Sequence, residues 1–235
     1  MNHEYPRPSL AVDIVVFTIL DSDLKVLLVR RKLEPFQGSW ALPGGFVEVG
    51  EGNRGGESLE VAAHRELQEE TSLPRDRVFL EQLYTFGDPE RDPRTRVVSV
   101  AYYALVRPEL IPLTRAATDA AEAQWFSVEQ ELPQLELAFD HTRVLDTALE
   151  RIRGKIDYTP IAFELVPETF TVSELRNVFE AIKGTSYDPP NFRRRFRRML
   201  TDGIILEAPG KRATGARPAK VFRFVRPPER RSAEP

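Results

Sequence analysis

The chain has 235 residues and a mass of 26.8 kDa, a length that fits one or two domains. Its hydrophobic share of 41% and charged share of 29% are typical of a globular protein and exclude a largely disordered one. The lack of cysteine excludes disulfide scaffolds, thiol nucleophiles and metal sites built on thiolates. The longest apolar run, residues 10–20, is too short to span a bilayer, and residues 1–8 carry no signal-peptide core, so we expect a cytoplasmic protein.

The two parts of the chain differ in charge. Residues 1–154 hold 17 basic and 26 acidic side chains, whereas residues 155–235 hold 16 basic and 10 acidic ones. An acidic part joined to a basic part indicates two tasks, and a polyanion is a candidate partner for the basic part.

The hydrophobic pattern predicts an α+β chain of two domains. A joint at residues 154–167, marked by glycine and proline, divides a first domain (1–154) from a second (155–226), and we expect a disordered tail over 227–235. The predicted strands cover residues 10–20, 25–31, 78–86, 96–106, 122–128, 204–207 and 221–225, and a short extended piece covers 40–45. The predicted helices cover residues 58–71, 139–153, 171–183 and 192–201.

Three glutamates lie on one side of the first predicted helix. Glu66, Glu69 and Glu70 are spaced i, i+3 and i+4, so their carboxylates crowd together. Such a group suits Mg²⁺ or Mn²⁺, hard cations that also hold phosphates. The alternative is a solvated acidic face. The metal site is favoured by Arg65, which can pin a carboxylate, and by a Gly-Gly loop before the helix, whose backbone can approach a ligand closely.

This stretch resembles the signature of the Nudix hydrolase superfamily, G-x5-E-x7-R-E-U-x-E-E-x-G-U, in which U is an aliphatic residue. Residues 57–73 match its second half, and residues 43–48, Pro-Gly-Gly-Phe-Val-Glu, are similar to its first half. The resemblance implies a Nudix α/β/α sandwich with a mixed sheet.

Two departures from the signature concern the geometry of its loops. An insert at residues 52–56 lengthens the first loop, so that either Glu51 or Glu57 can fill the first acidic position. The late glycine of the signature is Ser72 here, and serine adopts a positive φ less easily than glycine.

The resemblance implies hydrolysis of a nucleoside diphosphate linked to another group, in which a divalent cation neutralises the diphosphate and activates a water. It implies Glu66, Glu69, Glu70 and the carbonyl of Gly45 as metal ligands. The implied catalytic set is Glu57, Arg65, Glu66, Glu69 and Glu70.

Other residues of the first domain are weaker candidates. Asp119 or Glu122 could supply an additional acid to the site. The alternative is that both lie on the surface without a role in the site. Arg94 and Arg96 could bind a ligand phosphate together with the Gly44-Gly45 loop. The alternative is that both arginines are simply solvated. The three histidines, His3, His64 and His141, have no identifiable partner in the sequence and are assigned no catalytic role.

The last predicted helix is rich in arginine. Phe192, Phe196, Met199 and Leu200 form one apolar stripe, and arginines fill the other sides. A predicted hairpin with a basic tip follows. This order is typical of a winged helix-turn-helix, whose second helix enters the major groove while the hairpin touches the backbone or minor groove. The alternative is a solvated basic face for protein contacts.

The residues expected to contact DNA are Asn191, Arg193, Arg194, Arg195, Arg197, Arg198, Lys211, Arg212 and Arg217. The arginines can reach guanine edges and phosphates. Asn191 either reads adenine or caps the helix, and a cap is the commoner role for asparagine at a helix start.

A Nudix domain followed by such a domain resembles the Nudix-related transcriptional regulator (NrtR) family. Residues 85–93 and 157–165 are also similar to that family. The resemblance implies a bacterial repressor of genes for NAD, pyridine nucleotide or sugar metabolism, with ADP-ribose or a related nucleotide sugar as the signal.

Three interpretations compete. The first is a DNA-binding regulator whose Nudix domain senses a nucleotide sugar, with or without cleaving it. The second is a Mg²⁺-dependent hydrolase of the ADP-ribose pyrophosphatase type whose C-terminal domain serves only dimerisation. The third is a regulator with an inactive Nudix fold. The arginine helix favours the first over the second, because dimer contacts favour apolar residues. The intact glutamates favour it over the third.

We expect a homodimer, because paired recognition helices match a palindromic operator. A ligand between the acidic loop and residues 91–96 would change the angle between the domains and thus the spacing of the two recognition helices.

Overall fold

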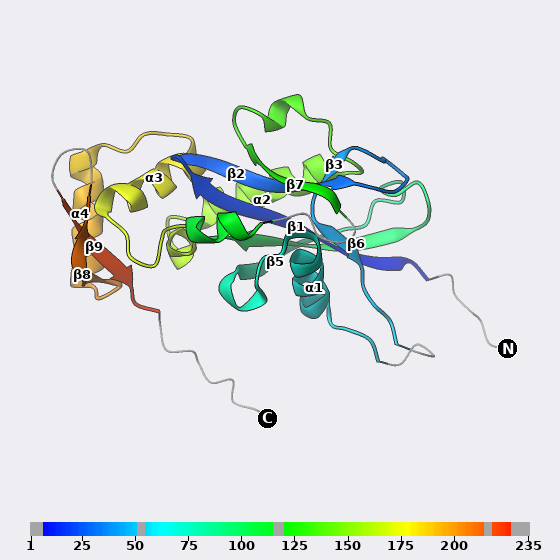
Figure 1. Ribbon diagram of the computed structural model, residues 1–235, viewed down its shortest axis with the longest axis horizontal. Coiled ribbons are helices and arrows are strands. Elements are labelled where there is room, and N and C mark those ends of the chain that lie inside the picture. Colours follow the sequence, from blue (N-terminus) through cyan, green and yellow to red (C-terminus); the bar gives the residue numbers. More distant parts are fainter. Residues whose placement is uncertain (1–6, 51–54, 115–119, 214–217, 227–235) are drawn as a thin grey trace.

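The computed structural model describes residues 7–50, 55–114, 120–213 and 218–226 (Figure 1). Its first part is a seven-stranded mixed sheet with helices against it, as the sequence predicts. The strands are β1 (Ser9–Leu20), β2 (Asp23–Arg31), β3 (Trp40–Ala41), β4 (Gly44–Phe46), β5 (Phe79–Phe86), β6 (Val97–Leu105) and β7 (Ala120–Ser127), and the helices are α1 (Leu59–Thr71) and α2 (His141–Lys155).

The central strand β1 has one neighbour, β6, along one edge and two neighbours, β4 and β2, along the other. It runs parallel to β6, whereas on its other edge it pairs antiparallel first with β4 and then with β2. The extended piece predicted over residues 40–45 divides at Leu42 and Pro43 into two short strands: β3 pairs with β2, and β4 pairs with β1. This division brings the Gly44-Gly45 loop against the middle of the sheet.

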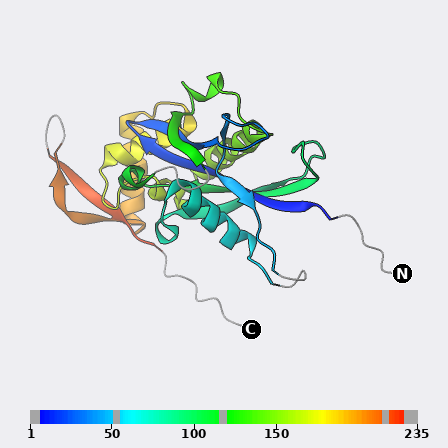
Figure 2. The same ribbon diagram turned by 45° about the vertical axis from the view of Figure 1, so that its right-hand side comes forward.

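The sheet is buried on both faces because β1 is apolar almost throughout. Val12, Ile14 and Val16 belong to the core under α1, whereas Val15 and Phe17 belong to the core under α2. Alternation along the strand thus supplies a hydrophobic layer to each side. Figure 2 shows α1 below the sheet and the second part of the chain at the end opposite the N-terminus.

The second part is a winged helix unit made of α3 (Val172–Lys183), α4 (Pro189–Thr201), β8 (Ile205–Arg212) and β9 (Ala219–Phe224). Thr171 and Glu174 form the predicted capping box at the start of α3. α4 begins three residues earlier than predicted: Asp188 is its cap and accepts a hydrogen bond from the Asn191 amide (3.0 Å). Two prolines are tolerated here because the first helical positions need no amide hydrogen. The cap role predicted as one option for Asn191 is therefore wrong.

The predicted joint at residues 154–167 is packed rather than open. It contains a short 3-10 helix, Pro160–Glu164, whose Ile161, Ala162 and Phe163 are buried. Phe163 stacks on Phe224 of the wing, with ring centroids 4.4 Å apart. One hydrophobic core continues from the sheet through α2 into α3 and α4, so the glycine and prolines at the joint do not make a loose linker.

A buried polar network ties β1 to the start of α2. Arg91 donates to Asp13 (2.9 Å) and to Asp140 (2.7 Å), and Ser99 also donates to Asp13 (2.6 Å). His141 accepts the Leu42 amide hydrogen at Nδ1 (2.9 Å) and turns Nε2 toward Asp13 at 3.4 Å. Burial acts to raise the pKa of Asp13, but His141, Arg91 and Ser99 lower it by more and hold it well below its usual range.

The C-terminus of α1 adopts the turn that the signature glycine would make. Ser72 follows the helix with φ +63°, and its amide donates to the Gln68 carbonyl. A left-handed conformation is costly for residues with a Cβ, and only glycine, or less often asparagine or aspartate, adopts it routinely.

Replacing Ser72 with glycine should stabilise the protein by about 0.5–1 kcal/mol, because it relieves this backbone strain. Urea unfolding of Ser72→Gly and of Ser72→Ala measures the effect. Alanine keeps the Cβ and should give no gain, and equal stability of all three proteins would contradict the explanation.

Asp13→Asn should lower the free energy of unfolding by about 3 kcal/mol, because it leaves Arg91 buried with one carboxylate instead of two. The exposed Asp21→Asn should change it by less than about 0.5 kcal/mol. Since the pKa of Asp13 is lowered in the folded state, its contribution is present above the ordinary aspartate pKa and is lost as the pH falls through the lowered pKa. Denaturant titrations of both variants between pH 2 and pH 5 test this: the difference should shrink below the ordinary aspartate pKa, and an unchanged difference down to pH 2 would contradict it.

Candidate nucleotide site and nucleic-acid interface

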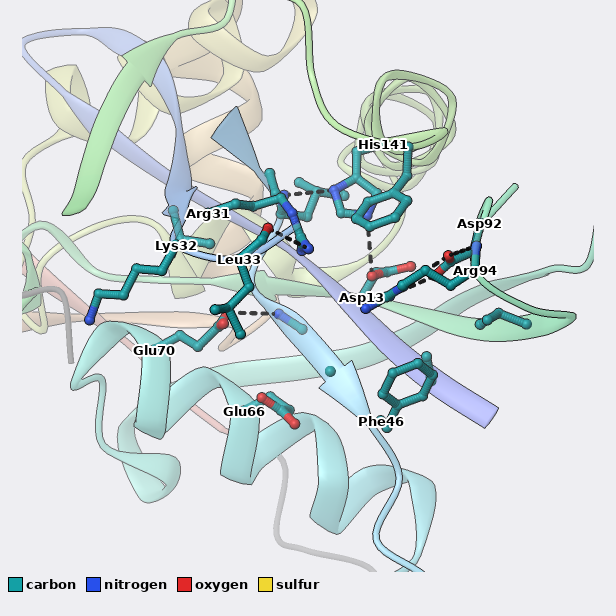
Figure 3. A pocket seen from close by; sticks show the side chains of 18 of the residues that line it. Asp13, Arg31, Lys32, Leu33, Phe46, Glu66, Glu70, Asp92, Arg94 and His141 are labelled. Carbon is teal, nitrogen blue, oxygen red and sulfur yellow. Dashed lines mark hydrogen bonds and ion pairs between the residues drawn. The ribbon is translucent and has the colours of Figure 1, made fainter. Parts of the chain in front are cut away.

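A cavity of about 350 Å³, lined by both polar and apolar residues, lies between α1, β4, the end of β2, residues 91–97 and the start of α2 (Figure 3). Glu66 and Glu70 line one wall from α1, and Arg31 and Lys32 line another from β2. Asp13 and His141 form its inner end. The cavity therefore offers carboxylates and cations on different sides, an arrangement that suits a phosphorylated ligand held with a cation.

Arg65 organises the acidic residues of the signature. Its guanidinium donates to Glu57 (2.6 Å), Glu66 (2.8 Å) and Glu69 (3.0 Å), and also to the Phe46 carbonyl (3.1 Å). The hydrogen bond from Arg65 lowers the pKa of Glu57, which also accepts the Glu48 amide hydrogen (2.9 Å). Glu57 thus fixes the loop to the helix.

The lengthened loop closes on itself before the helix. Val49 pairs with Gly56 in an isolated bridge, and the Glu57 amide donates to the Glu48 carbonyl (3.1 Å). The described part of the insert therefore leaves Glu57 in contact with Arg65. Glu51, the other candidate for the first acidic position, lies outside the described residues.

The two glycines of the loop lie directly on α1 and β1. The Gly44 amide donates to Glu70 (2.9 Å), and a Cβ at Gly44 would overlap the Val12 carbonyl oxygen. A Cβ at Gly45 would overlap the carboxylate of Glu66. The overlap with backbone at Gly44 requires glycine there, whereas at Gly45 the Glu66 carboxylate would have to move. Both glycines line the cavity.

The candidate metal ligands are carboxylate and backbone carbonyl oxygens, which are the ligands that hard divalent cations prefer. Burial is the main cause that raises the pKa of Glu66, a carboxylate that would gain from a nearby cation. Within the described ranges, no three acidic or histidine side chains already gather as ligands. Arg65 holds Glu66 and Glu69, and the Gly44 amide holds Glu70, so the predicted ligands lie near one another but engage protein donors. Of the three, Glu69 does not line the cavity.

The structure separates the other predicted ligand groups. Arg94 lines the cavity, whereas Arg96 donates to the Asp88 carbonyl (3.0 Å) and lies outside it. Glu122 forms an ion pair with Arg30 (3.7 Å), a residue of the cavity, and Asp119 lies outside the described residues. Arg96 is therefore not supported as a ligand residue by its position.

Sequence reasoning missed the inner end of the cavity. His141 has partners after all, Asp13 and the Leu42 amide, but they lie about a hundred residues away in the chain. The available signal was Asp13 itself, a charged residue within the long apolar strand β1. A buried charge needs a partner, so Asp13 within an apolar strand indicates that polar or charged side chains surround it.

α4 presents a continuous basic face. Phe192 and Phe196 are buried against the rest of the unit, as predicted, and Met199 and Leu200 pack against that core. Four arginines are exposed on the other sides at i, i+1, i+4 and i+5, so they are neighbours on the helix surface: Arg193, Arg194, Arg197 and Arg198. The Asn191 side chain accepts a hydrogen bond from Arg194 on this face.

Two predicted DNA contacts are turned into the protein instead. Arg195 pairs with Asp157 (3.0 Å) and lies 4.2 Å from the centroid of the Phe179 ring. Arg212 of the wing donates to Glu174 and to the Thr169 carbonyl. Both therefore hold the unit together. Lys211 is exposed on the wing, and Arg217 lies outside the described residues.

Models of two known domain families match the two parts of the chain. The NUDIX domain model matches residues 9–148, and the model of the NrtR DNA-binding winged helix domain matches residues 162–224. No helix in the described ranges has the length and apolar character needed to cross a membrane.

Two curated relatives and one solved structure are similar to the chain. The "ADPR responsive transcriptional repressor NtrR" of Acinetobacter baylyi is 36% identical over 94% of this chain and 84% of the relative. The "ADP-ribose pyrophosphatase" of Methanocaldococcus jannaschii is 40% identical over 60% of this chain and 73% of the relative. The crystal structure of Shewanella oneidensis NrtR with a 27mer DNA superimposes with a TM-score of 0.79 and 34% identity, over 92% of this chain and 93% of that one. The chain therefore belongs to the NUDIX family and carries a winged helix domain of the NrtR type.

Proposed function

We propose that the protein is a transcriptional repressor that binds operator DNA through its winged helix unit and responds to ADP-ribose bound in its NUDIX cavity. The observation that carries the proposal is the presence, in one packed chain, of the signature carboxylates at a cavity and an exposed arginine face on α4. A relative of similar length bears the name of an ADPR-responsive repressor.

We further propose that the NUDIX cavity hydrolyses the diphosphate of its ligand. Glu66 and Glu70, with the backbone at Gly45, would hold Mg²⁺ or Mn²⁺, with Glu69 as a further ligand once it leaves Arg65. When bound, such a cation neutralises diphosphate charge and lowers the pKa of a water. Arg65 holds the helix and loop in place, and Arg31 and Lys32 line the opposite side, where phosphate oxygens would be held.

The alternative is a hydrolase whose C-terminal unit serves only dimerisation. The exposed face of α4 argues against it, because four charged arginines suit an anionic partner better than a subunit interface. We propose a two-fold dimer in which two α4 helices meet successive major grooves of a palindromic duplex.

ADP-ribose turnover should require Mg²⁺ and should fall at least about 100-fold in Glu66→Gln and in Glu70→Gln, because each loses a carboxylate at the cavity. Glu60→Gln, an exposed position on the same helix, should behave like the wild type. Turnover is measured by product chromatography with and without EDTA, alongside thermal-shift titration with ADP-ribose. Binding without turnover would contradict the hydrolytic part and leave a sensor, whereas neither binding nor turnover would contradict ADP-ribose as the ligand.

Arg197→Ala should weaken binding to a duplex selected by the protein from a random pool by about 5- to 100-fold, and should reduce the salt dependence of binding by about one phosphate contact per chain. Fluorescence anisotropy at several salt concentrations measures both quantities. Arg77→Ala removes an equally exposed charge from the NUDIX domain and should change neither. Equal losses in the two variants would indicate a general charge effect rather than a DNA-binding face.

A further inference from the structure

Phe46 is an aromatic side chain at the edge of a cavity that polar and apolar residues line together. It ends β4, directly after Gly45, lines the cavity and is 45% exposed (Figure 3). The fold makes use of its backbone, since Phe46 pairs with Ala11 of β1 and its carbonyl accepts a hydrogen bond from Arg65. The ring itself belongs to neither hydrophobic core. Its position therefore suggests a contact with something that enters the cavity.

Arg94 lies beside this ring and is held in a fixed orientation. Its guanidinium carbon is 5.5 Å from the centroid of Phe46 and 5.8 Å from that of Phe139. Asp92, a buried residue, accepts two hydrogen bonds from the guanidinium, from Nε (3.0 Å) and Nη2 (2.7 Å). It also accepts the Arg94 amide hydrogen (2.9 Å). A bidentate pair of this kind fixes the plane of the guanidinium.

The pairing with Asp92 changes what Arg94 can offer a ligand. Asp92 compensates its charge, and the hydrogen bond from Arg94 is the main cause that lowers the pKa of Asp92. A neutralised, immobile guanidinium is a weak phosphate ligand but a good flat surface, because guanidinium planes stack on aromatic rings. Arg31 and Lys32 line the cavity across from Arg94 and offer positive charge to a phosphate from that side.

We propose that Phe46 and Arg94 form a stacking site for the planar base of the nucleotide ligand, with the diphosphate lying toward Glu66, Arg31 and Lys32. The proposal rests on the proposed function, because it assigns one part of the same ligand to one part of the same cavity. Stacking of a base on an aromatic ring is worth about 1–3 kcal/mol, so Phe46 would contribute about a 5- to 150-fold share of the affinity.

Isothermal titration with ADP-ribose tests the site in the full-length protein. Phe46→Ala should weaken binding about 10-fold or more, and Phe46→Trp should retain it, because an indole also stacks. Val49→Ala removes a more exposed apolar side chain of the same loop, outside the cavity, and should bind like the wild type. Phe46→Ala keeps the carbonyl that Arg65 uses, so its melting temperature should match that of Val49→Ala.

Arg94→Lys separates stacking from charge attraction. It keeps the positive charge but loses the planar group and the bidentate pair, so the proposal predicts a loss as large as that of Arg94→Ala. Retained binding in Arg94→Lys would overturn the stacking role of Arg94 and favour a phosphate contact.

Quenching of tryptophan fluorescence reports contact between the ligand and position 46. If Phe46 had only a structural role, an indole at this position would not respond to ADP-ribose. The indole introduced by Phe46→Trp should be quenched by ADP-ribose beyond the change seen in the wild type, whereas an indole introduced by Val49→Trp should not. Wild-type affinity in Phe46→Ala, or no added quenching in Phe46→Trp, would overturn the proposal while leaving the proposed function intact. No binding of ADP-ribose by the wild type would instead overturn the proposed function, and this proposal with it.

Discussion

Arg91 lies between two carboxylates in the interior, and the geometry of the cavity depends on that arrangement. Its side chain is 5% exposed and pairs with Asp13 of β1 and with Asp140, the residue before α2. A charge removed from water in this way is tolerated only with its partners in place, because the attraction between them must offset the lost hydration. The pairs therefore fix the sheet, residues 88–92 and the start of α2 relative to one another, and His141 then lies at the inner end of the cavity.

The same helix leads from the cavity to the DNA-binding unit. α2 begins at His141 and ends at Lys155, and near its end Arg153 donates to the Ile182 carbonyl of α3 (3.1 Å). The hydrophobic core continues across this contact. From the sequence, a ligand is expected to change the angle between the domains, but a loose hinge at residues 154–167 is difficult to reconcile with that packing. We expect a ligand to act through α2 and the shared core, or through the arrangement of two chains, rather than by bending an open linker.

The sequence predicts local features well where one segment contains all the information. The acidic helix, its arginine and the glycines before it are contiguous, and the structure places Arg65 on Glu57, Glu66 and Glu69. The capping box of α3 and the apolar stripe of α4 are equally local. Ser72 takes the place of the signature glycine, and the structure shows that it does adopt the positive φ, +63°, that serine reaches less easily.

Features that depend on distant segments were not predictable in this way. Arg195 and Arg212 share the composition of the DNA-binding face, but each pairs with an acidic residue of a distant segment. Arg195 of α4 meets Asp157, just after α2, and Arg212 of β8 meets Glu174 of α3, so only the tertiary packing brings these pairs together. Arg96 follows Arg94 by two residues, yet only Arg94 meets the buried Asp92 and the cavity. The composition of a segment gave the kind of surface, and tertiary contacts decided which side chains belong to it.

The central claim is that the cavity and the arginine face belong to one coupled system. The most direct measurement is the affinity of the wild-type protein for its selected duplex, by fluorescence anisotropy, as ADP-ribose is raised to saturation, with saturation established by thermal shift. Coupling of about 1–3 kcal/mol predicts a change in DNA affinity of about 5- to 150-fold, and the same factor in ADP-ribose affinity when DNA is bound. An unchanged DNA affinity at saturating ADP-ribose would contradict the account.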